Sequence, residues 1–381
     1  MTIPVIPTTD VAPYDALLLH SFGGPEGPDD VMPFLRNVTA GRGIPDERLE
    51  QVAEHYLHFG GRSPINDQNA ALLAALRAEL DRRGVTLPTA WGNRNWDPFV
   101  TDTLRELHDA GHRRVLVLTT SAYACYSSCR QYGEDLARAL ATLESEGRQI
   151  AVDKVRPYFN SPGFVTANTD AVRGAVGSLG GNARTPHVVF VTHSIPTTME
   201  DASGRDAPHG ATYRDQHLDL ARVVAGRLAA EGVPITWELA FCSRSGPPSQ
   251  PWLSPDVNDV LEARHAEGVD GVVLAPIGFV SDHMEVVYDL DTEARETAER
   301  LGMRMVRAAT AGTAEEFVAG LVDLVLERCG TERGEAPQRP AEGEIGPWPD
   351  ACSPGGCWRR DGEDSGVPAA ATRVDAEAVS A

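Results

Sequence analysis

Three acidic side chains recur at intervals of four residues in one short segment: Glu285, Asp289 and Glu293. In a helix, this spacing places all three carboxylates along one face. Their repulsion costs a few tenths of a kcal/mol per pair, and no lysine or arginine lies among them to relieve it. Uncompensated oxygen ligands suit a hydrated divalent cation that is handed on rather than trapped. The pattern therefore indicates a path for a metal ion; the alternative is a solvated acidic face in an acidic protein.

A histidine, His193, follows the apolar run 188–192 and precedes a turn that contains Pro196. Histidine accepts or releases a proton near neutral pH, and α/β folds place working residues at the C-terminal ends of parallel strands. We therefore interpret His193 as a candidate acid–base residue. His20 stands at the corresponding place after the first apolar run and is a direct competitor.

Arginine offers a planar pair of donors to a carboxylate, and several arginines are candidates for holding an acidic ligand. They are Arg36, Arg42, Arg62 and Arg94. The turn at residues 60–64 leads into a predicted helix whose first N–H groups could seat an anion. Each of these features is also typical of an ordinary surface.

The chain contains six cysteines and no recognisable signal peptide, so we interpret the cysteines as free, catalytic or metal-binding. They are Cys125, Cys129, Cys242, Cys329, Cys352 and Cys357. The last two stand in a tail that otherwise lacks features. Ligation of an iron–sulfur cluster would give them a role and fix the tail to the body. Two free thiols are the alternative.

Short apolar runs that alternate with amphipathic stretches must position these residues. Strands are expected at residues 16–19, 90–91, 115–119, 188–192, 236–241 and 272–276. A helix is expected at 65–83, capped by Asn66 or Asp67 and ended by Gly84. Another should begin near Ser281 or Asp282, either of which could cap it, and carry the three carboxylates. The alternation predicts an α/β fold with βαβ units and parallel sheets.

The two halves of the chain resemble each other weakly, since each opens with a strand that runs into a His-Ser pair. Chance similarity is the alternative. We predict two similar doubly wound, Rossmann-like domains, residues 11–165 and 166–330, with the site outside the strand C-termini. The last helix of the second domain is a candidate to pack on the first. Residues 331–381 are expected to form a cysteine-bearing, partly disordered tail.

The formal net charge is −21 at pH 7. Such a surface repels phosphate backbones and anionic lipid, which disfavours nucleic-acid binding and electrostatic membrane attachment. No stretch approaches 18 uninterrupted apolar residues, so no transmembrane helix is expected. These features predict a cytoplasmic protein without integral membrane association, and we expect a monomer.

Together these segments resemble the ferrochelatase family, from about residue 14 to residue 330. Residues 17–25 resemble the family's opening strand and turn, 59–65 its porphyrin-contact turn, and 250–255 a further loop. Residues 191–196 are similar to the segment with the family's catalytic histidine, which falls on His193. Residues 278–291 are close to the family signature, which places the essential glutamate on Glu285 and an Asp-His pair on Asp282 and His283.

The resemblance implies a chelatase that inserts Fe²⁺ into a porphyrin and releases two protons. A neutral His193 beside Glu285 would accept the pyrrole protons, and Asp289 and Glu293 would ease the loss of water from the metal. A clamping cleft would bend the macrocycle to expose its nitrogens. The residues expected to contact the substrate are Phe22, Arg42, Ser63 and Tyr132.

The resemblance also implies a cofactor, because some family members carry a [2Fe–2S] cluster on one cysteine of the first domain and three near the C-terminus. Cys125, Cys352 and Cys357 match that pattern, but the third tail cysteine is absent. The fourth ligand is left open between Cys129 and Cys329.

Family members divide between protoporphyrin IX and coproporphyrin III, which carries four propionates. Residues 34–45 are polar and basic where membrane-associated members have an apolar lip, which favours coproporphyrin III over the alternative, protoporphyrin IX. Phe22 stands where some Gram-positive members have a tyrosine that ligates the product iron, so that bond is not expected here. A non-catalytic haem or metal carrier and a cobalt or nickel chelatase of related fold are rival functions.

Overall fold

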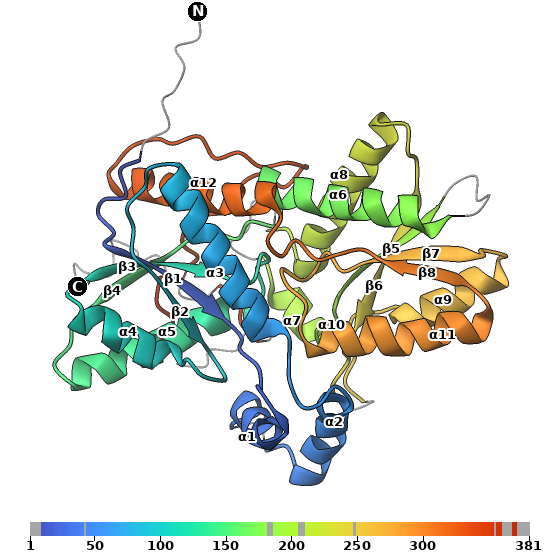
Figure 1. The fold of residues 1–381 in the computed structure, drawn as a ribbon, viewed down its shortest axis with the longest axis horizontal. Coiled ribbons are helices and arrows are strands. Elements are labelled where there is room, and N and C mark those ends of the chain that lie inside the picture. Colours follow the sequence, from blue (N-terminus) through green and yellow to red (C-terminus); the bar gives the residue numbers. More distant parts are fainter. Residues whose placement is uncertain are drawn as a thin grey trace, which may run out of the picture.

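The computed structural model describes residues 9–41, 43–180, 186–204, 210–246, 249–353, 356–359 and 368–371. Within them the chain forms two four-stranded sheets, each flanked by helices (Figure 1). Among these residues, no helix is both long and apolar enough to cross a bilayer.

The two sheets share one topology: the first has the strand order β2-β1-β3-β4, and the second has the order β6-β5-β7-β8. The strands are β1 (Ala16–Ser21), β2 (Thr89–Asn93), β3 (Arg114–Thr119), β4 (Ala151–Lys154), β5 (His187–His193), β6 (Thr236–Cys242), β7 (Gly271–Ala275) and β8 (Arg304–Arg307). All of their pairings are parallel. The repeated order confirms the predicted α/β class with two similar doubly wound halves.

Helices connect successive strands and cover both faces of each sheet. They are α1 (Pro28–Val38), α2 (Asp46–His58), α3 (Ile65–Arg82), α4 (Val100–Asp109), α5 (Gln131–Ser145), α6 (Pro162–Leu179), α7 (Thr197–Ala202), α8 (Tyr213–Ala230), α9 (Val257–Ala266), α10 (Met284–Tyr288), α11 (Ala294–Leu301) and α12 (Glu315–Glu332). Two π-helical turns, η1 (Tyr126–Arg130) and η3 (Asp289–Glu293), precede α5 and α11. The domain boundary predicted at residues 165–166 falls inside α6.

Alternate residues of the central strands face opposite sides of each sheet. Leu17 of β1 packs in the cluster that contains the buried face of α3, whereas Leu18 packs with α4 and α5. In β5, Phe190 and Val191 divide in the same way between α8 and α9. Burial on both faces explains why these strands read as continuous apolar runs in the sequence.

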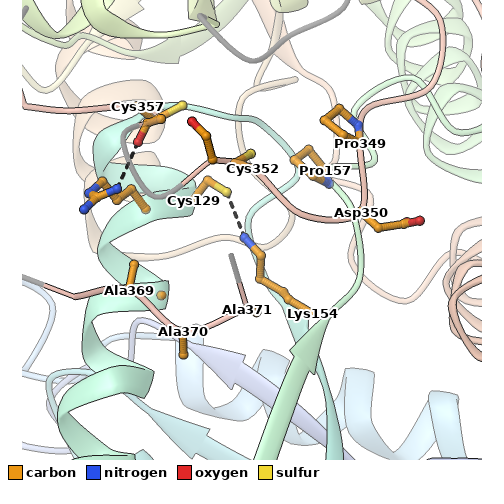
Figure 2. A pocket seen from close by; sticks show the side chains of 14 residues that line it. Cys129, Lys154, Pro157, Pro349, Asp350, Cys352, Cys357, Ala369, Ala370 and Ala371 are labelled. Carbon is orange, nitrogen blue, oxygen red and sulfur yellow. Dashed lines mark hydrogen bonds between the residues drawn. The ribbon is translucent and has the colours of Figure 1, made fainter. Parts of the chain in front are cut away.

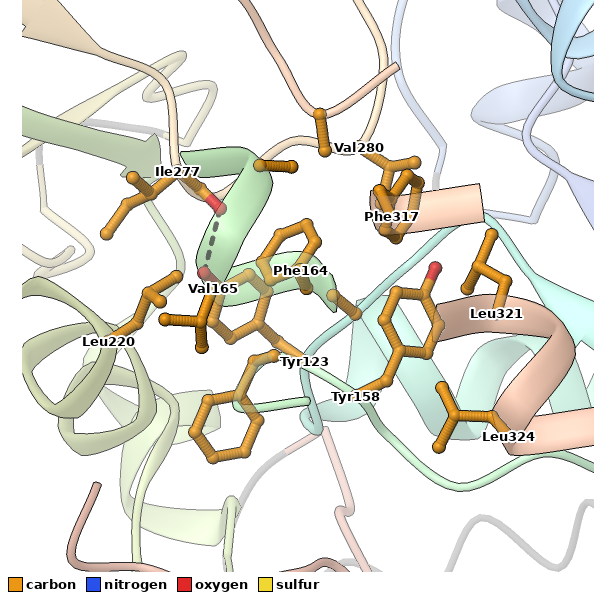
Figure 3. Close-up of a cluster of buried hydrophobic side chains, with 14 of the residues drawn as sticks. Tyr123, Tyr158, Phe164, Val165, Leu220, Ile277, Val280, Phe317, Leu321 and Leu324 are labelled. Carbon is orange, nitrogen blue, oxygen red and sulfur yellow. Dashed lines mark hydrogen bonds between the residues drawn. The ribbon is translucent and has the colours of Figure 1, made fainter. Parts of the chain in front are cut away.

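One hydrophobic cluster joins the two halves (Figure 3). Phe164 of α6 and Phe317 of α12 pack with their ring centroids 5.5 Å apart. The hydroxyl of Tyr123, after β3, donates to the carbonyl of Ile277, after β7, at 2.7 Å. Helix α12 contacts α3 as well as α6. These contacts hold the C-terminal ends of the two sheets in a fixed relation.

The sequence misses two strands, β4 and β8, and both are edge strands. Each has four residues and mixes charged with apolar side chains, so the apolar run that marks a buried strand is missing. The helix expected at 65–83 is confirmed as α3, with Gly84 beyond its end. The predicted caps are wrong: Asn66 and Asp67 lie inside the first turn, where Asn66 donates to the Gly24 carbonyl.

The described part of the tail packs against the body, which its composition does not predict. Trp348 is 1% exposed and lies edge to face against Phe159. Asp219 of α8 accepts a hydrogen bond from the N–H of Glu344 at 2.9 Å, and Asn160 donates to a tail carbonyl at 2.7 Å. No described residue after Glu332 lies in a helix or strand, so individual side chains anchor this segment.

Candidate active site

His193 ends β5, and Glu285 lies in the first turn of α10. Their side chains meet: Nε2 of His193 lies 3.4 Å from a carboxylate oxygen of Glu285. Nδ1 of His283 lies 3.8 Å from the same oxygen. The side chains of His193 and Glu285 are 32% and 48% exposed, so solvent reaches the pair. Folding therefore brings together the two residues that the sequence singles out for proton chemistry.

This contact sets the charge of the pair. Burial lowers the pKa of His193, but the Glu285 carboxylate, the Ser194 carbonyl and the charge of Asp289 together outweigh it and raise this pKa to about 9. Burial raises the pKa of Glu285, yet His193 holds it down at about 2. At neutral pH the pair is therefore an imidazolium and a carboxylate. The neutral His193 expected from the sequence stays a prediction for the site with its substrates bound.

The competing histidine, His20, is part of the core. It is fully buried, and its Nδ1 lies 3.0 Å from the Gly92 carbonyl. Burial lowers the pKa of His20 to about 3, so its ring stays neutral. The second sheet, not the first, supplies the histidine that faces a carboxylate.

A close approach between β5 and the loop after β7 sets the geometry of the pair. The N–H of Gly278 donates to the β5 backbone at 3.1 Å. A Cβ on Gly278 would lie 2.1 Å from Oγ1 of Thr192, so only glycine fits. The Thr192 hydroxyl lies 2.8 Å from both the Tyr213 hydroxyl and Nε2 of His217. This buried network fixes the end of β5 immediately before His193.

Arg307 of β8 holds the segment that carries Glu285. Its guanidinium donates to both oxygens of Asp282, at 3.0 and 3.1 Å, and to Asp291 at 2.8 Å. The N–H of Asp282 donates to the Gln68 side chain of α3 at 2.8 Å, which ties the segment to the first half. Arg307 thus forms ion pairs with two carboxylates. The three carboxylates at four-residue spacing have no lysine or arginine partner among the described residues.

The predicted helix that carries Glu285, Asp289 and Glu293 is present, but its cap and its type differ from the prediction. Its N-cap is His283, not Ser281 or Asp282, and it changes to the π-helical turn η3 after one turn. A π-turn bonds residue i to i+5 and widens the helix, so residues four apart are offset about the helix axis differently than in an α-helix. Sequence periodicity does not reveal such a turn, because the extra residue leaves no compositional mark.

The acidic side chains still act on one another. Burial raises the pKa of Asp289 to about 7, and the charges of Glu285 and Glu293 add to the rise. The Ser243 hydroxyl donates a hydrogen bond to Asp289, and this bond opposes the rise in pKa. Asp289 is therefore poised to lose a proton when a cation approaches.

Helices α1 and α2 stand out from the first sheet, and α2 contacts α10 (Figure 1). Met284, the neighbour of Glu285, packs in their apolar cluster. His55 of α2 stacks on Tyr288 of α10, with ring centroids 3.8 Å apart. Phe34 and Leu35, which begin the segment that the sequence identifies as a polar lip, belong to the same cluster as Met284.

A ferrochelatase family model matches residues 14–329. The chain belongs to the ferrochelatase family. It is 56% identical to the coproporphyrin III ferrochelatase of Streptomyces griseus subsp. griseus, over 91% of this chain and 94% of that protein. It is 52% identical to the coproporphyrin III ferrochelatase of Leifsonia xyli subsp. xyli (92% and 92%) and 47% identical to the ferrochelatase of Rhodopirellula baltica (90% and 93%). Among solved structures, SirB from Bacillus subtilis with Fe³⁺ aligns with a TM-score of 0.49 and 12% identity, over 84% of this chain and 97% of SirB.

The remaining residues expected to contact the ferrochelatase substrate differ in exposure. Ser63 and Tyr132 are 3% and 4% exposed; Ser63 packs behind the loop after β1, and Tyr132 lies edge to face against His20. Phe22 is half-buried. Arg42 lies outside the described residues. Substrate contact through these four residues stays a prediction.

Three cysteines line one cavity of about 30 Å³ between η1, β4 and the tail: Cys129, Cys352 and Cys357 (Figure 2). Cys125 does not line it. That residue precedes η1 in extended conformation, is fully buried, and contacts the hydroxyls of two neighbouring serines. Cys329 lies on α12 and is also absent from the cavity. Of the cysteines in the body, the structure therefore favours Cys129 over the predicted Cys125 as the partner of the tail.

The chemistry of this cavity fits the [2Fe–2S] cluster expected from the sequence in part. Three of the four sulfurs that such a cluster takes are present. Among the described residues, no three His, Cys, Asp or Glu side chains are placed to hold one metal ion. A two-iron cluster does not require three protein ligands around one metal ion, because each iron takes two protein ligands. Asp350 lines the cavity, but its carboxylate points away from the cysteines and accepts from Arg339 (Figure 2).

Proposed function

We propose that this chain inserts ferrous iron into coproporphyrin III and releases two protons. The observation that carries the proposal is the contact between His193 and Glu285, 3.4 Å apart, beside two carboxylates that have no lysine or arginine partner within the described part of the chain. Two of the relatives are named coproporphyrin III ferrochelatases, which supports this choice of substrate.

The unpaired carboxylates draw the metal to the site. A hydrated Fe²⁺ ion is attracted by the field of Asp289 and Glu293, whose oxygens replace its water one at a time. The positive charge lowers the pKa of Asp289, which loses its proton and binds more strongly. Arg307 limits competition from Asp282 and Asp291 for the ion, because its guanidinium already donates hydrogen bonds to both carboxylates.

The His193–Glu285 pair handles the protons. A cation at Glu285 cancels the negative charge that holds the proton on His193. Burial then lowers the pKa of His193, and the ring releases its proton through its exposed side. The neutral ring is a base for a pyrrole proton. Metal entry and proton removal are therefore coupled through one carboxylate.

Exposed arginines suit a porphyrin with many propionates. Arg36 and Arg62 form surface ion pairs with Asp46 and Asp67, each at 2.8 Å. Such pairs are worth about 0–1 kcal/mol, so a propionate can replace the internal partner at small cost. Arg94 is instead committed to a buried ion pair.

Anaerobic Fe²⁺ insertion, followed by the absorption spectrum of the product, tests the function. We expect a higher kcat/KM with coproporphyrin III than with protoporphyrin IX in detergent. The opposite preference would reverse the choice of substrate. Haem binding without insertion would indicate a carrier, and preference for Co²⁺ or Ni²⁺ would indicate a chelatase for another metal.

We also propose that Cys129, Cys352 and Cys357 hold a [2Fe–2S] cluster. When bound, such a cluster supplies one-electron redox chemistry. The chain itself holds the tail in place: the Arg130 guanidinium lies 3.6 Å from the Trp358 ring centroid and donates to a tail carbonyl at 3.2 Å. Iron and acid-labile sulfide in protein purified without oxygen test the proposal. The cytoplasmic location and the monomeric state remain predictions from the sequence.

A further inference from the structure

Lys154 is the only lysine in the chain. Lysine and arginine together number 34, and the other 33 are arginine. It ends β4 and is 8% exposed. Its Nζ donates to Sγ of Cys129 at 2.8 Å (Figure 2). Among the described residues, no carboxylate forms an ion pair with it. A buried ammonium requires a counter-charge, and the sulfur atoms of the cavity are the groups placed to supply one.

The arginines near the cavity already have partners of another kind. Arg130 pairs with Glu134 at 3.1 Å and lies over Trp358, and Arg156 pairs with buried Glu327 at 2.7 Å. The planar fork of arginine matches a carboxylate, whereas an ammonium is a compact point charge with three donors. The single lysine therefore stands where the partner is a sulfur.

We propose that Lys154 is the charge partner of the iron–sulfur cluster: it donates a hydrogen bond to the Cys129 ligand and raises the reduction potential of the cluster. The inference rests on the proposed cluster. A cluster held by thiolates is anionic and gains one further negative charge when an external donor reduces it; no covalent bond changes. A fixed positive charge beside a ligand sulfur stabilises the reduced form more than the oxidised form. Burial limits screening of this effect by salt.

Two substitutions test the charge. Lys154→Met removes it, and Lys154→Arg keeps it. Arg148→Met is the matched control, because it removes one positive charge from an exposed ion pair in the loop before β4. Each protein is purified without oxygen, analysed for iron and sulfide, and titrated with dithionite while visible absorption and electron paramagnetic resonance are recorded.

We expect the equilibrium constant for reduction to fall at least tenfold in Lys154→Met, which is about 59 mV for a one-electron couple. Lys154→Arg should recover most of the loss, and Arg148→Met should match the wild type. If Lys154→Met has a full cluster content and an unchanged reduction potential, the inference about Lys154 is overturned, whereas the proposed cluster is not. If Lys154→Met loses the cluster, retention in Lys154→Arg supports the role of charge, and loss from both well-folded variants overturns it. A wild-type protein without iron and sulfide would overturn the proposed cluster, and this inference with it.

A second measurement uses the fact that Lys154 provides the only side-chain amine. Its reaction with an amine-specific reagent is read from one peptide by mass spectrometry, separately from the N-terminus. We expect slow labelling in cluster-containing wild type and faster labelling in Cys352→Ser. Rapid labelling of the cluster-containing wild type would place the ammonium in solvent and contradict the inference.

Discussion

Replacing Glu285 by glutamine should change the charge of His193. The substitution keeps the size of the side chain and removes a negative charge 3.4 Å from Nε2. Burial lowers the pKa of His193, whereas Glu285, the Ser194 carbonyl and Asp289 raise it, and the net result is a rise from 6.5 to about 9. In Glu285→Gln only the Ser194 carbonyl and Asp289 oppose burial, which is the largest single effect. We therefore expect the pKa of His193 to fall to 6.5 or below.

The shift bounds what the pair contributes to stability. One pH unit of pKa is worth about 1.36 kcal/mol, so the rise from 6.5 to about 9 corresponds to at most about 3.4 kcal/mol. The Glu285 side chain is 48% exposed, and solvent screening reduces such an interaction to about 1 kcal/mol. We expect Glu285→Gln to lower the free energy of unfolding by that smaller amount.

The pH dependence has a definite sign. The folded-state pKa of His193 is raised, so its stabilisation is fully present below pH 6.5 and is lost as the pH rises through about 9. The folded-state pKa of Glu285 is lowered, so its stabilisation is present above pH 4.5 and is lost as the pH falls through about 2. The stability difference between wild type and Glu285→Gln should therefore be largest from pH 4.5 to 6.5 and shrink towards pH 9.

Nuclear magnetic resonance titration of ¹⁵N-labelled histidine side chains measures the pKa, with His193→Ala to identify the resonance. Urea denaturation across the same pH range measures the stability. Glu238→Gln is the control, because it removes a carboxylate 2.9 Å from Nε2 of His187 at the opposite end of β5; it should leave the pKa of His193 unchanged. A wild-type His193 that titrates near 6.5 and does not respond to Glu285→Gln would refute the ionised pair.

Three further substitutions test other parts of the structure. Asp289→Asn should raise the KM for Fe²⁺ severalfold with little change in the KM for porphyrin, because it removes an unpaired carboxylate from the metal path; equal changes in both would contradict that path. Gly278→Ala should lower the free energy of unfolding by about 1–3 kcal/mol in urea, because the added Cβ meets a threonine hydroxyl at 2.1 Å. Gly226→Ala, which has open space around it, should cause no loss. Cys129→Ser should remove the visible absorption of the proposed cluster and Cys125→Ser should not; the reverse result would return the ligand role to Cys125.

The central strands are where the sequence predicted most. Strands β1, β3, β5 and β7 are buried on both faces, so each is a continuous apolar run, and their alternation with helices fixes the α/β class. The edge strands β4 and β8 are half-solvated and carry arginine, aspartate and lysine. Neither strand shows an alternation of apolar and polar residues or a continuous apolar run, which are the two patterns that indicate a strand. Lys154 ends one of these strands, and only the folded structure shows that its ammonium lies beside the thiol of Cys129.

The choice between neighbouring cysteines needed the backbone. Cys125 and Cys129 are four residues apart and equal in type. Cys125 has extended backbone, with φ −154° and ψ −174°, and its thiol lies in the core. Cys129 lies within the π-helical turn that follows and faces the tail. A π-turn depends on packing around it, so composition did not distinguish the two thiols.

The sequence by itself determined which residues could perform chemistry: a histidine after an apolar strand and a glutamate in an acidic segment, both visible because residue type and local spacing are written in the chain. Only the tertiary structure decided their state. His193 is charged because Glu285 lies 3.4 Å away, and Asp282 forms an ion pair because Arg307 reaches it from another strand. Electrostatic interactions depend on distance in space. For residues far apart in the chain, folding alone sets that distance.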